Sequence, residues 1–239
     1  MTPPARETVR TERTFPRFNL SQRWEHALLI LSFTVLLLTG LPQKFRNTPW
    51  SQTILATPER VELVRTIHRT TAAIFILEAL YHVGGGLLAL SRRRLSSDIF
   101  PTGRDVRDAG QMLRYLLFLS PRPPRFGKYS FEQKFTYWFL FFGFGILIAS
   151  GLMLWFPTLA TRILPGGIIP AAKLAHSSEA VVSAIFVVLW HFYHVHLERL
   201  NLSIFTGRLN ERDMRRHHAL EFERVTGEPA SDETPGDGE

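Results

Sequence analysis

Apolar residues gather in four long runs, separated by connectors that are rich in arginine and proline. The runs cover residues 24–42, 66–90, 135–156 and 171–197. A transmembrane helix needs about 20 predominantly apolar residues. The third run has no charge, and it lacks the polar stripe at helical period that a helix of a soluble bundle would show. The pattern therefore predicts an all-α, membrane-embedded bundle of four transmembrane helices.

Lysine and arginine beside the runs predict the orientation of the bundle. They are dense before residue 24, between residues 91 and 134, and after residue 198, and sparse in the other two connectors. Because cytoplasmic loops carry the excess of basic residues, both termini and the middle connector are expected in the cytoplasm, with the bundle in the inner membrane. We divide the chain into an N-terminal arm (1–23), a four-helix domain (24–197) and a tail (198–239) that ends in a disordered acidic stretch. Residues 105–119 have amphipathic helical spacing and are expected to lie on the lipid surface.

Composition narrows the function. The chain has 239 residues, a formal net charge of +7 and no cysteine. Without cysteine it holds no disulfide, no iron–sulfur cluster and no thiol-linked haem. The basic balance follows the membrane topology, and no aromatic and basic recognition face is present, so nucleic acid is not an expected partner.

Histidines recur at two depths of the bundle. His68 and His82 are separated by about 21 Å and about 40° on one helix, and His176 and His191 by about 22 Å and about 60° on another. Because these helices run antiparallel, His68 and His176 meet at the outer side. His82 and His191 lie at the cytoplasmic side, where His26 joins them.

Two neutral imidazoles on opposite sides of an iron are the ligands of a b-type haem, and ligation removes the cost of histidine in lipid. Glycine at 84–86 and alanine at 72–73 leave room for a porphyrin. A lone membrane histidine more often bonds a neighbouring helix. A divalent-metal carrier is the rival, but it would group carboxylates with histidines at one depth. Only Glu179 stands beside His176, and Glu78 is alone in mid-span. His217 and His218, in the polar tail, are expected to be solvated.

Several motifs together resemble the cytochrome b subunit of formate dehydrogenases and nickel–iron hydrogenases. They are "RWEH" at the first span, "RTIHR" at the second, "GKYSFEQKFTYW" before the third, and "WHFYHVH", "FTGRL" and "RRHH" from the fourth onward. The likeness covers about residues 15–224. It implies a di-haem, quinone-reactive membrane anchor in which His68 and His176 hold the outer haem iron and His26 and His191 hold the cytoplasmic one. It also places a quinone near the connector before the third span, where the candidates are Tyr129, Ser130, Glu132 and Gln133.

The chain also carries histidines beyond this pattern. His194 lies 18 residues after His176, hence on nearly the same face of a regular α-helix, which makes it the strongest challenger to His191. His82 is an alternative to His26, or His82 and His196 hold a third haem. The preferred interpretation is that these extra histidines bond haem propionates or quinone.

The predicted function is electron transfer between a partner redox subunit and the membrane quinone pool. The cofactors would be two b haems, or three, with menaquinone or ubiquinone as the exchangeable substrate. The partner would be an iron–sulfur or multihaem cytochrome subunit, because this chain has no catalytic centre of its own beyond quinone chemistry. Glu132 is the first candidate for proton transfer and Glu25 the second. The alternatives are a free-standing cytochrome b that exchanges electrons between soluble reductants, and a non-redox metal carrier.

Overall fold

The chain divides into two compact units. The computed structural model describes residues 13–93, 97–197 and 200–230. The membrane unit comprises Ser21–Ser97 and Phe135–Leu202. The connector unit comprises Met1–Leu20, Asp98–Lys134 and Ser203–Glu239. Each unit is described by itself below.

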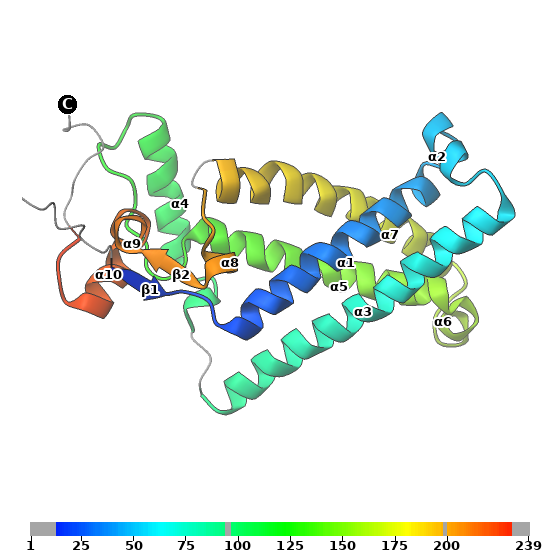
Figure 1. The fold of residues 1–239 in the computed structure, drawn as a ribbon, viewed down its shortest axis with the longest axis horizontal. Coiled ribbons are helices and arrows are strands. Elements are labelled where there is room, and N and C mark those ends of the chain that lie inside the picture. The colour runs from blue at the N-terminus through cyan, green and yellow to red at the C-terminus, as the bar shows by residue number, and fades with distance from the viewer. Residues whose placement is uncertain (1–12, 94–96, 198–199, 231–239) are drawn as a thin grey trace, which may run out of the picture. The chain divides into compact units, whose positions relative to one another are not determined.

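The membrane unit consists of long apolar helices, labelled in Figure 1. In the part of the chain that the structure describes, four helices are long and apolar enough to cross a membrane, which confirms the predicted fold class. They are α1 (Leu20–Lys44), α3 (Pro58–Ser91), α5 (Phe131–Trp155), and α7 (Ile168–Phe186), which continues through the π-helical turns η2 (Val187–His191) and η3 (Tyr193–Leu197).

Helix α3 begins eight residues before the predicted apolar run, because its start is set by capping and not by hydropathy. Thr57 is the N-cap residue, its side chain accepts a hydrogen bond from the Arg60 amide, and Pro58 occupies the first helical position. Proline also opens the short helices α2 (Pro49–Ile54) and α6 (Pro157–Ile163), which lie in the two connectors poor in basic residues.

Aromatic side chains pack the membrane helices against one another. The buried Phe75 of α3 meets Phe144 of α5 edge-on at 5.2 Å between ring centroids, and Phe33 of α1 lies 5.7 Å from the same ring. Phe139 of α5 stacks on Phe186 of α7 at 4.1 Å. Buried serines, which let backbones approach closely, accompany these contacts on α1, α5 and α7.

The connector unit joins three segments that are distant in sequence. Strand β1 (Thr14–Pro16) pairs antiparallel with β2 (Arg208–Asn210), so the N-terminal arm meets the tail. Phe15 packs edge-on against Phe222, which is fully buried in a small apolar core. The helical elements of this unit are η1 (Ser97–Ile99), α4 (Gly103–Leu116), α8 (Ser203–Thr206), α9 (Glu211–His217) and α10 (Ala219–Thr226).

The expectation that His218 is solvated was wrong. Its side chain is 2% exposed, and its Nδ1 donates to the Gly127 carbonyl at 2.8 Å. The adjoining Leu220 amide donates to the Phe126 carbonyl at 3.0 Å. The histidine is therefore buried because the tail packs against the middle connector, a long-range contact that local polarity could not reveal. Of the acidic stretch expected to be disordered, residues 231–239 lie outside the described residues.

Ion pairs fasten the arm to the tail. The Arg13 guanidinium donates to Glu211 at 2.8 Å and to Glu228 at 3.0 Å. These hydrogen bonds from Arg13 are the main reason that the pKa values of both carboxyl groups lie below their ordinary value. Because Arg13 and Glu228 face solvent and Glu211 is partly exposed, the pairs contribute orientation more than stability.

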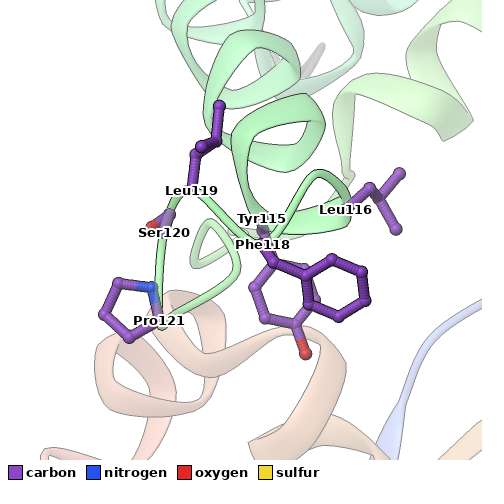
Figure 2. A pocket seen from close by; sticks show the side chains of 6 residues that line it. All are labelled: Tyr115, Leu116, Phe118, Leu119, Ser120 and Pro121. Atoms are coloured by element: carbon purple, nitrogen blue, oxygen red, sulfur yellow. The ribbon is translucent and has the colours of Figure 1, made fainter.

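Helix α4 has the amphipathic character predicted for residues 105–119. The Asp105 carboxylate accepts a hydrogen bond from the Thr102 amide at the helix start. The end of α4 and the turn after it present consecutive apolar side chains around a shallow pocket, and Phe118 is 96% exposed (Figure 2). Exposed apolar side chains of this kind suit a lipid interface. Their position on the membrane surface stays a prediction.

Candidate functional site: histidine pairs across the membrane helices

His68 and His176, the predicted outer pair, face each other across the membrane unit. His68 lies on α3 and His176 on α7, and their ring centroids are 6.3 Å apart. Both side chains are partly buried between the helices. The structure thus brings together two imidazoles that are 108 positions apart in the chain.

Hydrogen bonds at Nδ1 identify the tautomer of the imidazole rings of His68 and His176. The Thr39 hydroxyl donates to the Val35 carbonyl at 2.7 Å, so it accepts from Nδ1–H of His68 at 2.9 Å. Nδ1–H of His176 donates to the Leu147 carbonyl at 3.0 Å. In both neutral rings the lone pair therefore lies on Nε2, the nitrogen available to a metal. A second hydrogen bond of this kind is the usual support for a ligating histidine.

Gly40 and Gly151 allow the imidazole rings of His68 and His176 to lie close to the backbones of α1 and α5. A Cβ atom at Gly151 would lie 3.0 Å from Cε1 of His176, and one at Gly40 would lie 3.3 Å from Cε1 of His68. Each glycine directly follows a hydroxyl residue that lies within hydrogen-bonding distance of the same ring, Thr39 for His68 and Ser150 for His176. Sequence reasoning missed these positions. The repeated hydroxyl–glycine dipeptide, once on α1 and once on α5, was the signal that could have found them.

His26 and His191 form a second pair. His26 lies near the start of α1 and His191 at the end of η2, and their ring centroids are 6.2 Å apart. His191 is 15 residues beyond His176 on the same continuous helix, so the two pairs lie at different depths.

Both separations suit a metal held between two imidazoles. With metal–nitrogen bonds of about 2.1 Å and a ring centroid about 1.1 Å beyond each nitrogen, the two centroids would be about 6.4 Å apart. The observed 6.3 Å and 6.2 Å come close to this value. The residues present therefore fit an iron that would be held by one histidine from each of two helices.

The π-helical turns bring His191, and not His194, opposite His26. The angular argument for His194 assumed a uniform α-helix after His176. A π turn holds more residues than an α turn and rotates everything after it. In the structure His194 bonds through Nδ1 to the Trp190 carbonyl at 2.8 Å and its ring lies 4.3 Å from that of Trp190. His191 instead faces His26.

His82 has a different environment from the paired histidines. Its Nδ1 lies 2.9 Å from a Glu25 carboxylate oxygen, and its Nε2 lies 3.0 Å from the Tyr137 hydroxyl. Both ring nitrogens are thus engaged by side chains, which favours a hydrogen-bonding role. The backbone of His196 lies in η3, and its side chain lies outside what the structure describes.

Two carboxylates in the spans are each held by a serine. The Ser32 hydroxyl lies 3.4 Å from Glu78, and the Ser183 hydroxyl donates to Glu179 at 3.0 Å. Among the described residues, no group of three histidine, aspartate or glutamate side chains converges as a metal site would. This part of the chain therefore offers the metal-carrier hypothesis no cluster of ligands.

The connector residues that were expected near a quinone lie around the start of α5. Ser130 and Gln133 cap the helix reciprocally. The backbone N–H of Gln133 donates to the Ser130 hydroxyl, and the backbone N–H of Ser130 donates to the side-chain oxygen of Gln133. Glu132 is in the same first turn. The Arg17 guanidinium lies 5.1 Å from the centre of the Tyr129 ring, and burial raises the pKa of Tyr129.

The fold and the paired histidines together define a class, that of helical membrane proteins whose spans present imidazoles in pairs at two depths. The model of the prokaryotic cytochrome b561 family matches residues 17–207, and the chain belongs to this family, whose cofactor is haem b. The chain is also 25% identical, over 204 residues, to the cytochrome b556 subunit of formate dehydrogenase from Haemophilus influenzae. That match covers 84% of this chain and 79% of the relative. The comparisons confirm the resemblance identified from the motifs.

Proposed function

We propose that this electron-transfer protein carries two b haems and passes electrons between a partner redox subunit and the membrane quinone pool. The single observation that carries the proposal is the presence of two cross-helix histidine pairs, at 6.3 Å and 6.2 Å, at two depths of one bundle. Two irons spaced along the membrane normal would carry an electron across most of the apolar layer.

His68 and His176 would hold one haem iron, and His26 and His191 the other. Bound there, the haems supply one-electron redox chemistry at two fixed positions. The protein sets the tautomer of His68 and His176: the Thr39 hydroxyl and the Leu147 carbonyl each accept a hydrogen bond from an imidazole Nδ1–H, which orients the ring and raises its basicity.

The basic residues of the arm, middle connector and tail support a position of the His26 and His191 pair on the cytoplasmic side of the inner membrane. Quinone reduction at that side requires protons. Glu132, in the first turn of α5, is the carboxyl group of the connector that we propose for this task.

A partner must supply the electrons that the quinone receives. The relative from Haemophilus influenzae is named as a subunit of formate dehydrogenase, which supports membership of a larger redox complex. Because this chain has no cysteine, any iron–sulfur relay belongs to the partner. An iron–sulfur or multihaem cytochrome subunit fits this requirement.

Haem counting tests the proposal. A pyridine haemochrome assay on the purified chain should give two b haems per chain, extracted intact by acid. His176→Ala should give one, and His217→Ala, on the connector unit, should still give two. One haem or none in the unaltered protein would overturn the assignment.

Affinity purification from the native membrane tests the partner. A stable redox subunit that co-purifies with the chain supports the proposal. A haem-loaded chain that purifies alone, and whose haems are reduced by ascorbate, would instead support a free-standing cytochrome.

A further inference from the structure

Glu25, His82 and Tyr137 form a continuous chain of hydrogen bonds across three helices. Glu25 lies on α1, His82 on α3 and Tyr137 on α5. The two links measure 2.9 Å and 3.0 Å, and they use the two opposite nitrogens of one imidazole. This arrangement, a carboxylate, an imidazole and a hydroxyl in line, allows a proton to enter one side of the ring while another leaves the opposite side.

Residues beside this series of hydrogen bonds hold the Glu25 carboxylate in place. The Ser21 hydroxyl lies 2.9 Å from Glu25 and 3.0 Å from the Tyr81 hydroxyl. The Ser21–Tyr81 contact is a second link between α1 and α3, in addition to the one from Glu25 to His82. Glu78 precedes His82 by one helical turn and bonds Ser32. Glu25 is thus positioned as an acceptor for the imidazole.

The location of His82 suits a reaction with a lipid-soluble substrate. It is 14 residues beyond His68 on α3, about 21 Å along the helix, and so lies at the depth of the His26 and His191 pair. Its side chain is 45% exposed on the membrane unit, whereas that of Glu25 is 22% exposed. A quinone that diffuses in the lipid can therefore approach the imidazole, while the carboxylate stays behind it.

We propose that His82 and Tyr137 deliver protons to the quinone, with Glu25 orienting His82. This inference rests on the proposed function. In its imidazolium form, His82 donates through Nδ1 to Glu25 and through Nε2 to the Tyr137 hydroxyl oxygen. The Tyr137 O–H is then directed away from the histidine and is the group that bonds a quinone oxygen.

The proton transfer balances as follows. A quinone becomes a quinol by taking two electrons, which the haems would supply, and two protons. The Tyr137 O–H bond breaks as a quinone O–H bond forms, and the Nε2–H proton of His82 restores the tyrosine. This transfer supplies one of the two protons, and His82, left neutral, takes a new proton from the aqueous phase.

The test separates proton delivery from electron transfer. The full-length, haem-loaded chain in nanodiscs is reduced with stoichiometric dithionite and mixed rapidly with decylubiquinone, which needs protons, or with ferricyanide, which takes an electron alone. Tyr137→Phe and His82→Gln should each slow haem re-oxidation by decylubiquinone at least about tenfold, because positioned general acids contribute about 10²–10⁴-fold. Their haem content and their rate with ferricyanide should be unchanged. The matched control is Tyr193→Phe, which removes a phenolic hydroxyl that is not part of the hydrogen bonds linking Glu25, His82 and Tyr137.

Each other outcome overturns a specific statement. Variants that react with decylubiquinone at the rate of the unaltered protein would refute the relay and leave the proposed function standing. Variants that are equally slow with ferricyanide would show damage to the electron path and would also refute the relay. Unaltered protein that reacts with ferricyanide but not with decylubiquinone would refute the quinone reaction itself, and the relay with it.

Discussion

Substitution of Gly151 tests the outer histidine pair without touching either imidazole. An added Cβ at this position would lie 3.0 Å from Cε1 and 3.3 Å from Nδ1 of His176. Ordinary contacts of a Cβ atom begin at 3.4 Å, so the ring must move by about 0.4 Å or more. The ring is also tied to the Leu147 carbonyl at 3.0 Å, and moving it strains that bond.

The magnitude follows from the cost of overpacking. Forcing an extra methyl group into a packed site costs about 1–3 kcal/mol, and about 1.4 kcal/mol corresponds to a tenfold change in affinity. Gly151→Ala should therefore weaken binding of the outer haem about 5- to 150-fold while leaving the inner haem in place. The control is Gly145→Ala on the same helix, where an added Cβ meets nothing within 4 Å. That change should be neutral or stabilise α5 by about 0.5–1 kcal/mol.

The assay is haem content per chain after dilution into haem-free buffer, combined with electron paramagnetic resonance of the oxidised protein. Gly151→Ala should lose one of two low-spin signals or shift it, whereas Gly145→Ala should retain both. Two unshifted signals and full haem content in both variants would refute the close packing of Gly151 on a haem ligand.

Four further predictions follow from the same geometry. Thr39→Val removes the acceptor of an imidazole N–H and should raise the midpoint potential of the outer haem by about 40 mV if that bond contributes about 1 kcal/mol, as redox titration would show. His191→Ala should lose the haem held by the His26 and His191 pair, and His194→Ala should keep it. The reverse result would make His194 the ligand. Glu132→Gln should slow quinone turnover with both haems bound and reducible, and a normal rate would remove this carboxyl from the reaction. The pKa of Glu211 is lowered mainly by the hydrogen bond from Arg13, so the small stabilisation of the connector unit by this pair is present above the unfolded pKa of 4.5 and is lost as pH falls through the folded value; hydrogen-exchange protection factors in that unit should fall slightly there.

The parts of the fold that sequence reasoning predicted are those governed by local composition. Four spans follow directly from four apolar runs, because lipid excludes unsatisfied backbone and charge over the length of a helix. The meeting of His68 with His176 was also predictable, since helix periodicity fixes where each imidazole points and antiparallel packing fixes its depth.

The connector unit was not predictable in the same way. Its stability comes from long-range contacts, such as the pairing of Phe15 with Leu209 and the burial of Phe222, and each segment taken alone appears polar. The expectation that His218 is solvated was wrong for this reason. Thr39 and Tyr137 were likewise missed, because their partners lie on other helices.

The departure of the fourth span from α-helical geometry changes which histidine can serve as a ligand. On a regular helix, 18 residues bring His194 back to the face of His176, which makes it the strongest challenger to His191. The π turns η2 and η3 add residues without adding full turns, so His191 faces His26 while His194 turns onto Trp190. Such turns are rare and are frequently found at functional sites. We infer that the turns place His191, and not His194, opposite His26.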